Sequence, residues 1–192
     1  MAVTVRPLTP ERFADVEVIF NAKGCSVARG CWCMYYRVSG KGALTRPGEG
    51  QRRSSKDALK ALAKQDPPPG LIGYRGKTPV GWISLGPRED YAKLAKSPVM
   101  KPVDEQPVWS VVCFVVPSEY RKQGVARELL SGAVAYAKKR GVGLLEAYPV
   151  DKELPSAADA SWFGSKRMFD QAGFDEVARR RRDRPVVRLR IG

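Results

Sequence analysis

The sequence predicts an α/β fold in which helices flank a mixed sheet. Short apolar runs rich in β-branched residues alternate with longer stretches whose apolar residues recur every three or four positions. Some of these strand-like runs are close enough to pair as hairpins, whereas others are separated by helical segments. With 192 residues and 43% hydrophobic content, the chain can bury one sizeable core. We therefore expect a single domain over residues 1–192.

The first part of the chain predicts one strand and two helices. Residues 3–6 form a short β-type run, and residues 56–65 form a helical pattern that the prolines after Asp66 bring to an end. Between these lies an earlier helix, defined by the cap Thr9, by Pro10 at its first position, and by the apolar face of Phe13, Val16 and Phe20. Residues 24–50 are irregular and rich in glycine.

The remaining elements alternate between strands and helices. The predicted strands are residues 71–75, 80–85, 108–116, 144–150 and 186–191, and the predicted helices are residues 124–140 and 164–171. A turn at residues 76–79 makes the first two strands a hairpin, and residues 88–106 lack a clear period, which predicts a surface loop. The pattern contains no internal repeat.

Composition excludes several kinds of chemistry. The chain has no histidine, which removes Ser-His and Cys-His catalytic pairs and the commonest general base. Cys25, Cys31 and Cys33 offer three thiols without a CxxC pair, and with no histidine to complete a zinc site we expect no metal. Cys113 lies in an apolar run, so disulfides are not expected either.

Charge and hydropathy predict a protein of the cytoplasm that attracts anions. The sequence carries 34 Lys and Arg against 20 Asp and Glu, a formal charge of +14. Such a surface attracts nucleotides, nucleic acid or coenzyme A, and charge alone does not choose among them. The chain has neither an apolar run of the ~20 residues that span a bilayer nor the apolar core of a secretory signal. We expect no membrane partner.

The most informative segment runs from Phe114 through a basic turn to Arg127. It predicts an apolar strand, a short turn and the start of a helix, whose free N–H groups and positive dipole end suit an anion. Gly124 and the small Ala126 allow the backbone to approach a pyrophosphate closely. An ordinary strand–helix connection with a solvated turn remains the alternative when this segment is considered alone.

This segment resembles motif A of the GNAT N-acetyltransferase superfamily, whose signature is Arg/Gln-x-x-Gly-x-Gly/Ala after an apolar strand. The sequence Arg121-Lys122-Gln123-Gly124-Val125-Ala126 matches it fully. The resemblance implies the GNAT acyl-CoA N-acyltransferase fold, with a mixed central sheet of about six to seven strands flanked by helices, and acetyl-CoA as co-substrate. The cofactor-binding residues that it implies are Phe114, Val115, Val116, Arg121, Lys122, Gln123, Gly124, Val125, Ala126 and Arg127.

The sequence departs from the family at its usual catalytic positions. The family's tyrosine acid, four residues before Gly-Phe, is replaced by Phe169, and Trp162 stands at its asparagine position. Phenylalanine cannot donate a proton to the departing thiolate. Ser110 occupies the position of a glutamate that acts as base in some relatives. Catalysis by positioning, with an N–H at Val116 polarising the carbonyl, is therefore the simplest hypothesis.

Glu146 and Tyr148 are the candidate catalytic side chains. They alternate onto one face of the predicted strand 144–150, which flanks the acceptor cleft in this fold. A structural role for Glu146, paired with a nearby Lys or Arg, is the alternative.

The acceptor pocket is expected around an unusual aromatic and sulfur-rich segment. This segment resembles a Cys-Trp-Cys stretch of some bacterial GNAT proteins, and its candidate pocket residues are Cys31, Trp32, Cys33 and Tyr35. Aromatic and sulfur side chains make an adaptable apolar wall, although local core packing is the alternative. Arg179–Arg182 would contact the CoA 3′-phosphate, an acidic partner or solvent.

The sequence as a whole predicts a transfer of acetyl from acetyl-CoA to the primary amine of a small molecule or peptide, by direct attack in a ternary complex. The alternative is a degenerate domain that binds CoA or nucleic acid through its basic surface. A homodimer is compatible with either function.

Overall fold

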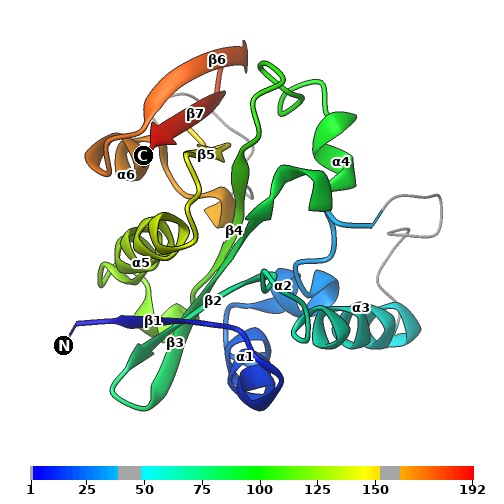
Figure 1. The fold of residues 1–192 in the computed structure, drawn as a ribbon. Coiled ribbons are helices and arrows are strands. Elements are labelled where there is room, and N and C mark those ends of the chain that lie inside the picture. The colour runs from blue at the N-terminus through cyan, green and yellow to red at the C-terminus, as the bar shows by residue number, and fades with distance from the viewer. Residues whose placement is uncertain (1, 39–48, 152–160) are drawn as a thin grey trace.

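The computed structural model describes residues 2–38, 49–151 and 161–192, and they form a seven-stranded sheet between two layers of helices (Figure 1). The strand order is β1-β2-β3-β4-β5-β7-β6. The strands are β1 (Thr4–Pro7), β2 (Gly70–Arg75), β3 (Thr78–Pro87), β4 (Trp109–Val115), β5 (Leu144–Ala147), β6 (Asp175–Arg181) and β7 (Arg184–Arg190). The predicted mixed sheet of the GNAT fold is thus confirmed.

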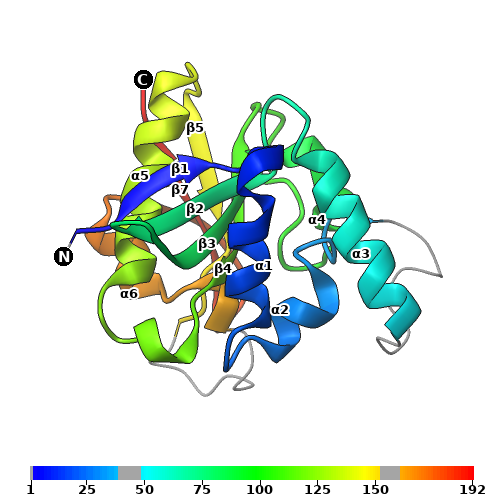
Figure 2. The same cartoon turned by 90° about the horizontal axis from the view of Figure 1, so that it is seen from below.

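Helices cover both faces of the sheet, with α5 and α6 on one side and α1, α2 and α3 on the other (Figures 1 and 2). The α-helices are α1 (Phe13–Asn21), α2 (Ser26–Cys31), α3 (Glu49–Leu62), α4 (Ala92–Ala95), α5 (Val125–Lys139) and α6 (Lys166–Gln171). Short 3₁₀ turns are η1 (Pro10–Arg12), η2 (Arg88–Asp90), η3 (Ser118–Tyr120) and η4 (Ser161–Phe163). No described helix combines the length and the apolar character that crossing a membrane requires.

The centre of the sheet opens where its one parallel pair of neighbouring strands ends. β4 and β5 run parallel, whereas the remaining pairs of neighbouring strands in the sheet are antiparallel. The β4–β5 register covers only three residue pairs, from Trp109↔Leu145 to Val111↔Ala147. Beyond Val111, β4 continues to pair with β3, and on its β5 side it has no strand partner among the described residues. The end of β4 therefore offers a strand edge inside the sheet.

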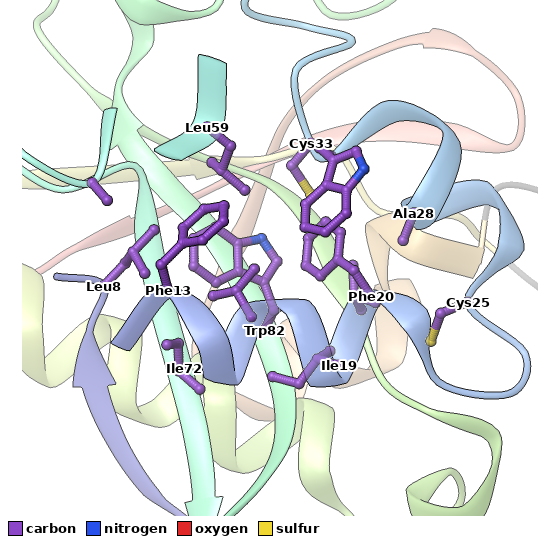
Figure 3. Close-up of a cluster of buried hydrophobic side chains, with 14 of the residues drawn as sticks. Leu8, Phe13, Ile19, Phe20, Cys25, Ala28, Cys33, Leu59, Ile72 and Trp82 are labelled. Carbon is purple, nitrogen blue, oxygen red and sulfur yellow. The ribbon is translucent and has the colours of Figure 1, made fainter. Parts of the chain in front are cut away.

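The two faces of the sheet carry separate clusters of buried side chains. On the α1 face, Phe13, Phe20 and Trp82 gather beneath the helix, and Leu59 of α3 closes the cluster (Figure 3). On the opposite face, Leu129 and its neighbours in α5 pack against β1, β2 and β3. Because each strand alternates its side chains between these clusters, both faces fix the register of the sheet.

Glycines in β2 and β3 let α5 lie close to the sheet. A Cβ at Gly73 or Gly81 would fall 2.9 Å from the methyl groups of Leu129, which is closer than real Cβ atoms approach. The same close fit brings Val125, the first residue of α5, within 3.0 Å of a Cβ at Gly81. These contacts hold the N-terminus of α5 beside the end of β4.

Several elements differ from those that the sequence predicts. α3 begins at Glu49 rather than residue 56, and residues 88–106 contain α4 rather than loop alone. The charged run 175–181 forms β6, which pairing with β7 stabilises despite its polar composition. β6 lies at the sheet edge and pairs on one side only, so polar side chains are tolerated there and the run carries no apolar alternation to indicate a strand.

Candidate functional site

A cavity of about 1010 Å³ lies where β4 loses its partner. Three parts of the chain line it: the end of β4 with the turn and α5, the segment from Gly24 to Tyr36, and the segment from Trp162 to Gln171. The cavity thus brings the predicted cofactor motif and the predicted acceptor segment to one place. These two segments are separated by about 80 residues in the sequence, so it is the tertiary fold that places them side by side.

The cofactor end of the cavity is formed by the N-terminus of α5. Gly124 has φ +81° and a Cβ there would meet no atom within 4 Å, so the space in front of it is open. The first intrahelical bond joins the Glu128 N–H to the Gly124 carbonyl, which leaves the N–H groups of residues 125–127 without helical acceptors. No side chain caps the helix. Together with the helix dipole, these N–H groups make an anion site.

The strand edge of β4 continues from this anion site into the cavity. Residues 112–116 all line it, and their β5 side lacks a strand partner. The carbonyl of Val116 accepts a hydrogen bond from Arg121 Nε at 2.9 Å, so the N–H of Val116 is the main-chain polar group that this residue retains for a ligand.

Two basic-turn residues use their side chains to hold the turn itself. The guanidinium of Arg121 bonds the Val116 carbonyl and, through Nη2, the Gly24 carbonyl at 2.6 Å. Gln123 accepts from Arg75 at 2.6 Å and donates to the Glu119 carbonyl. Both residues were expected to bind cofactor, but their side chains bond the loop. Lys122 and Arg127 are the other exposed cations of the motif.

The end of the cavity predicted to hold the acceptor is lined by the Cys-Trp-Cys segment. Cys31, Cys33, Tyr35 and Tyr36 line the cavity, whereas Trp32 does not. Trp32 is 3% exposed and stacks on Phe20 with ring centroids 5.1 Å apart. The assignment of Trp32 to the substrate pocket was therefore wrong. Trp32 and Cys33 have φ of 47° and 53°. This left-handed turn directs the indole into the core and the thiols of Cys31 and Cys33 toward the cavity.

Comparison with known proteins agrees with this geometry. A sequence profile of the acetyltransferase (GNAT) family matches residues 40–160. The chain belongs to the GNAT acetyltransferase family. Among solved structures, PaiA N-acetyltransferase from Thermoplasma acidophilum in complex with coenzyme A is 18% identical over 99% of both chains, with a TM-score of 0.55.

Two further GNAT structures show the same fold at low identity. Ribosomal-protein-alanine N-acetyltransferase from Brucella melitensis is 18% identical over 97% of this chain and 99% of its own, with a TM-score of 0.57. YncA from Salmonella typhimurium, solved with acetyl-CoA, is 17% identical over 100% of this chain and 95% of its own, with a TM-score of 0.52. A search among curated proteins found no significant match.

Within this GNAT fold, the two candidate catalytic side chains on β5 and just after it lie outside the cavity. The carboxylate of Glu146 is fully buried and accepts from Arg88 and Arg188, each at 2.8 Å. The hydroxyl of Tyr148 donates to the same carboxylate at 2.7 Å, so both side chains do share a face, as the alternation predicted. Burial, followed by the charge of Glu146, raises the pKa of Tyr148. These groups satisfy one another inside the protein, and neither side chain is among the described residues that line the cavity.

The positions where GNAT relatives carry an acid and a base are also buried. Phe169 is fully buried between Phe114 and Phe174. Ser110 is fully buried, and its hydroxyl lies 3.0 Å from that of Tyr148. Trp162, at the asparagine position, does line the cavity. The structure therefore uses two of these three positions for packing rather than for proton transfer.

All four cysteines line the cavity as free thiols. A hydrogen bond to Cys33, together with burial, raises the pKa of the Cys113 thiol. Burial and the neighbouring Cys33 raise the pKa of Cys31 to about 12. The thiols of Cys31 and Cys113 are therefore protonated at neutral pH, and the sulfur side chains form a weakly polar wall. Within the described residues, no cluster of three or more His, Cys, Asp or Glu is suited to a metal ion.

The arginine run on β6 is largely occupied by local partners. Arg179 bonds Glu176 and Asp151, Arg180 bonds the carbonyls of Val99, Lys101 and Pro102, and Arg181 bonds Asp183. None of these arginines lines the cavity. The contact with a CoA 3′-phosphate is therefore not supported by this geometry, and the run acts to brace the β6–β7 hairpin.

Sequence reasoning missed several residues of the cavity wall. Val27, Tyr36 and Tyr120 line it, as do Arg167, Met168 and Gln171 of α6. The α6 residues carry a usable signal, because positions three and four apart share one helix face. Val27 carries none, since an exposed valine on a six-residue helix is common on any surface.

Proposed function

We propose that this protein is an acetyl-CoA-dependent N-acetyltransferase that moves an acetyl group to a primary amine by direct attack in a ternary complex. One observation carries the proposal: the open N-terminus of α5 and the free edge of β4 share a cavity that continues to the segment from Cys31 to Tyr36. A cofactor with a pyrophosphate, an extended arm and a terminal thioester has the shape of that cavity.

The backbone supplies most of the cofactor contacts in this mechanism. The N–H groups of residues 125–127 hold the pyrophosphate, with Lys122 and Arg127 beside them. The arm extends along residues 114–116 as an added strand would, and the Val116 N–H polarises the thioester carbonyl. Because Arg121 holds the Val116 carbonyl, the peptide that follows this N–H is fixed before the substrate binds.

The reaction requires little from side chains. The amine nitrogen attacks the carbonyl carbon, the C–N bond forms, and the C–S bond of the tetrahedral intermediate breaks to release CoA. The amine loses one proton and the CoA thiolate gains one. Holding both reactants in one water-poor cavity supplies the rate enhancement, since well-oriented reactions reach effective molarities of about 10⁵ M or more.

A degenerate CoA-binding or nucleic-acid-binding domain is the second candidate, because Phe169 and Ser110 are buried at the usual acid and base positions. The arginines that motivated nucleic-acid binding are bonded to nearby protein groups, which weakens that part of the alternative. A binding domain would hold CoA without releasing it from acetyl-CoA in the presence of any amine.

The first experiment is calorimetric titration of the protein and its Gly124→Glu variant with acetyl-CoA. The substitution places a carboxylate in front of the free N–H groups, and we expect affinity to fall by about 100-fold or more. Gly124→Gln separates the negative charge from the added bulk. Gly141→Glu is the matched control, because Gly141 also has positive φ and open space but lies at the far end of α5. Tight binding by Gly124→Glu would refute the cofactor site.

A further inference from the structure

Aromatic rings enclose the acceptor end of the cavity. Tyr35, Tyr36 and Trp162 line it together with the thiols. Tyr35 and Tyr36 meet edge to face with centroids 4.8 Å apart, and Tyr36 meets the ring of Phe163 at 5.7 Å. Tyr35 remains 43% exposed, so this ring wall reaches from the mouth of the cavity inward. Such a wall suits a flat apolar ligand.

Cations of the protein itself already lie on these rings. Lys93 Nζ lies 3.9 Å from the ring centroid of Tyr35, and the Arg184 guanidinium lies 3.9 Å from that of Phe163. The amide of Lys93 also donates to the Tyr36 carbonyl, which fixes α4 beside the ring wall. Within the described part of the chain, neither Lys93 nor Arg184 forms an ion pair with a carboxylate. Lys93 therefore covers a face of Tyr35, which is a ring of the cavity wall, whereas Arg184 lies behind the wall, where its Nη2 donates to the Tyr148 carbonyl at 3.2 Å.

The charged side chains among the described residues of the cavity wall are all positive. They are Arg121, Lys122 and Arg127 in the predicted cofactor motif and Arg167 on α6. An alkylammonium ion entering this space would be repelled by these cations and by Lys93 on a face of Tyr35, whereas an uncharged amine would not be repelled and could pack on Tyr36 and Trp162. Burial lowers the pKa of both Lys93 and Arg184, which shows that these cations lie where water screens them poorly.

We propose that the acceptor is an aromatic amine that is uncharged at neutral pH, held against the ring wall of Tyr35, Tyr36 and Trp162. This inference rests on the proposed acetyltransferase function. An aromatic amine brings its lone pair without prior deprotonation, which fits a site whose usual base position is the buried Ser110. Its nitrogen attacks the thioester carbonyl, CoA leaves as the thiolate, and the ammonium proton of the intermediate passes to that thiolate.

The test compares two isomeric amines of equal size. 4-Methylaniline is uncharged at neutral pH, whereas benzylamine is an ammonium ion, and spermidine serves as a polycation. Acetylated product and free CoA are measured by liquid chromatography with mass detection at pH 7. We expect kcat/KM for 4-methylaniline to exceed that for benzylamine by at least about tenfold, with no product from spermidine. Preference for benzylamine or spermidine would overturn the proposal.

A pair of lysine variants tests the cause of the preference. Lys93→Gln removes the cation over Tyr35, and Lys96→Gln removes the same charge from an exposed residue at the end of the same helix. We expect Lys93→Gln to lower the ratio of 4-methylaniline to benzylamine turnover by about two- to fivefold, and Lys96→Gln to leave it unchanged. Equal shifts in both variants would contradict the role of the ring wall.

Two failures are distinguishable. If the protein binds acetyl-CoA but acetylates none of the three amines, the acceptor class is wrong while the cofactor site stands. If the protein does not bind acetyl-CoA, the proposed function itself fails.

Discussion

Two regions beside β4 contain the residues for which the sequence predicted function, and they treat polar groups in opposite ways. At the N-terminus of α5, the N–H groups of residues 125–127 have no helical acceptor and face a cavity. Around Glu146, the carboxylate, the two arginines and the tyrosine satisfy one another inside the protein. Both regions are rich in polar groups, but only the first keeps its hydrogen-bonding capacity for a ligand. Unsatisfied polar groups therefore indicate the site better than residue type does.

This difference predicts that substitutions around Glu146 change stability and not cofactor binding. Glu146→Gln removes the charge that Arg88 and Arg188 share, so among the described residues it leaves the largely buried Arg88 without a carboxylate partner and Arg188 with Asp104 alone. We expect unfolding in urea to show a loss of about 3–5 kcal/mol, which for a domain of this size lowers Tm by roughly 6–20 °C.

Acetyl-CoA affinity of the Glu146→Gln variant should stay within about twofold of the original when it is measured below the melting transition. Glu176→Gln is the matched control, since its exposed pair with Arg179 should contribute less than about 1 kcal/mol. If Glu146→Gln reduced turnover while the protein stayed folded, the comparison would fail and Glu146 would regain a catalytic role.

Removing a single hydroxyl from the same network should produce a smaller loss. Tyr148→Phe keeps the buried ring but removes the donor to Glu146 and the contact with Ser110. We expect a loss of about 1–2 kcal/mol in chemical denaturation and an unchanged profile of activity against pH. A profile that loses one limb would show that the phenol exchanges a proton with substrate.

The smallest effect concerns the exposed end of the network and depends on pH. The hydrogen bond from Arg188 lowers the pKa of Asp104 in the folded protein. The folded state therefore binds fewer protons than the unfolded state, so this contribution is present above the unfolded pKa of about 3.9 and is lost as pH falls through the folded value.

Urea midpoints of the protein and of Asp104→Asn should accordingly differ at pH 7 and converge below about pH 4. Asp175→Asn, which changes a neighbouring acid on β6 that has no hydrogen-bond or ion-pair partner among the described residues, should show no such convergence. A constant difference from pH 7 to pH 3 would mean that the carboxylate contributes through shape and not through charge.

The parts of the site that the sequence predicted are those that local patterns encode. Gly124, the apolar strand before it and the helix after it lie within one continuous segment, and their geometry follows from backbone chemistry. The burial of Glu146 in ion pairs depends on Arg88 and Arg188, which lie far from it in sequence. No local pattern shows that these charges will be buried together.

The Cys-Trp-Cys segment shows the same limit of sequence-based prediction for the direction of a single side chain. The composition of the Cys-Trp-Cys segment indicated an apolar surface, but not that Trp32 would turn inward while Cys31 and Cys33 face the cavity. Two consecutive left-handed residues make that reversal, and such conformations are rare outside glycine. The rings of Phe13 and Phe20 (Figure 3), which are distant in sequence, stabilise this conformation by stacking with the indole of Trp32.

Arg121 has a consequence for any attempt to exchange acceptor segments between enzymes of this family. Its guanidinium joins the Gly24 carbonyl to the Val116 carbonyl, and the Ser118 N–H bonds the neighbouring Lys23 carbonyl. The stretch that leads into the acceptor wall is thus fastened to the turn that precedes α5. A transplanted segment keeps its position only if it also presents carbonyl groups to this arginine and this amide. The segment from Cys31 to Tyr36 and the turn before α5 would therefore have to be exchanged together.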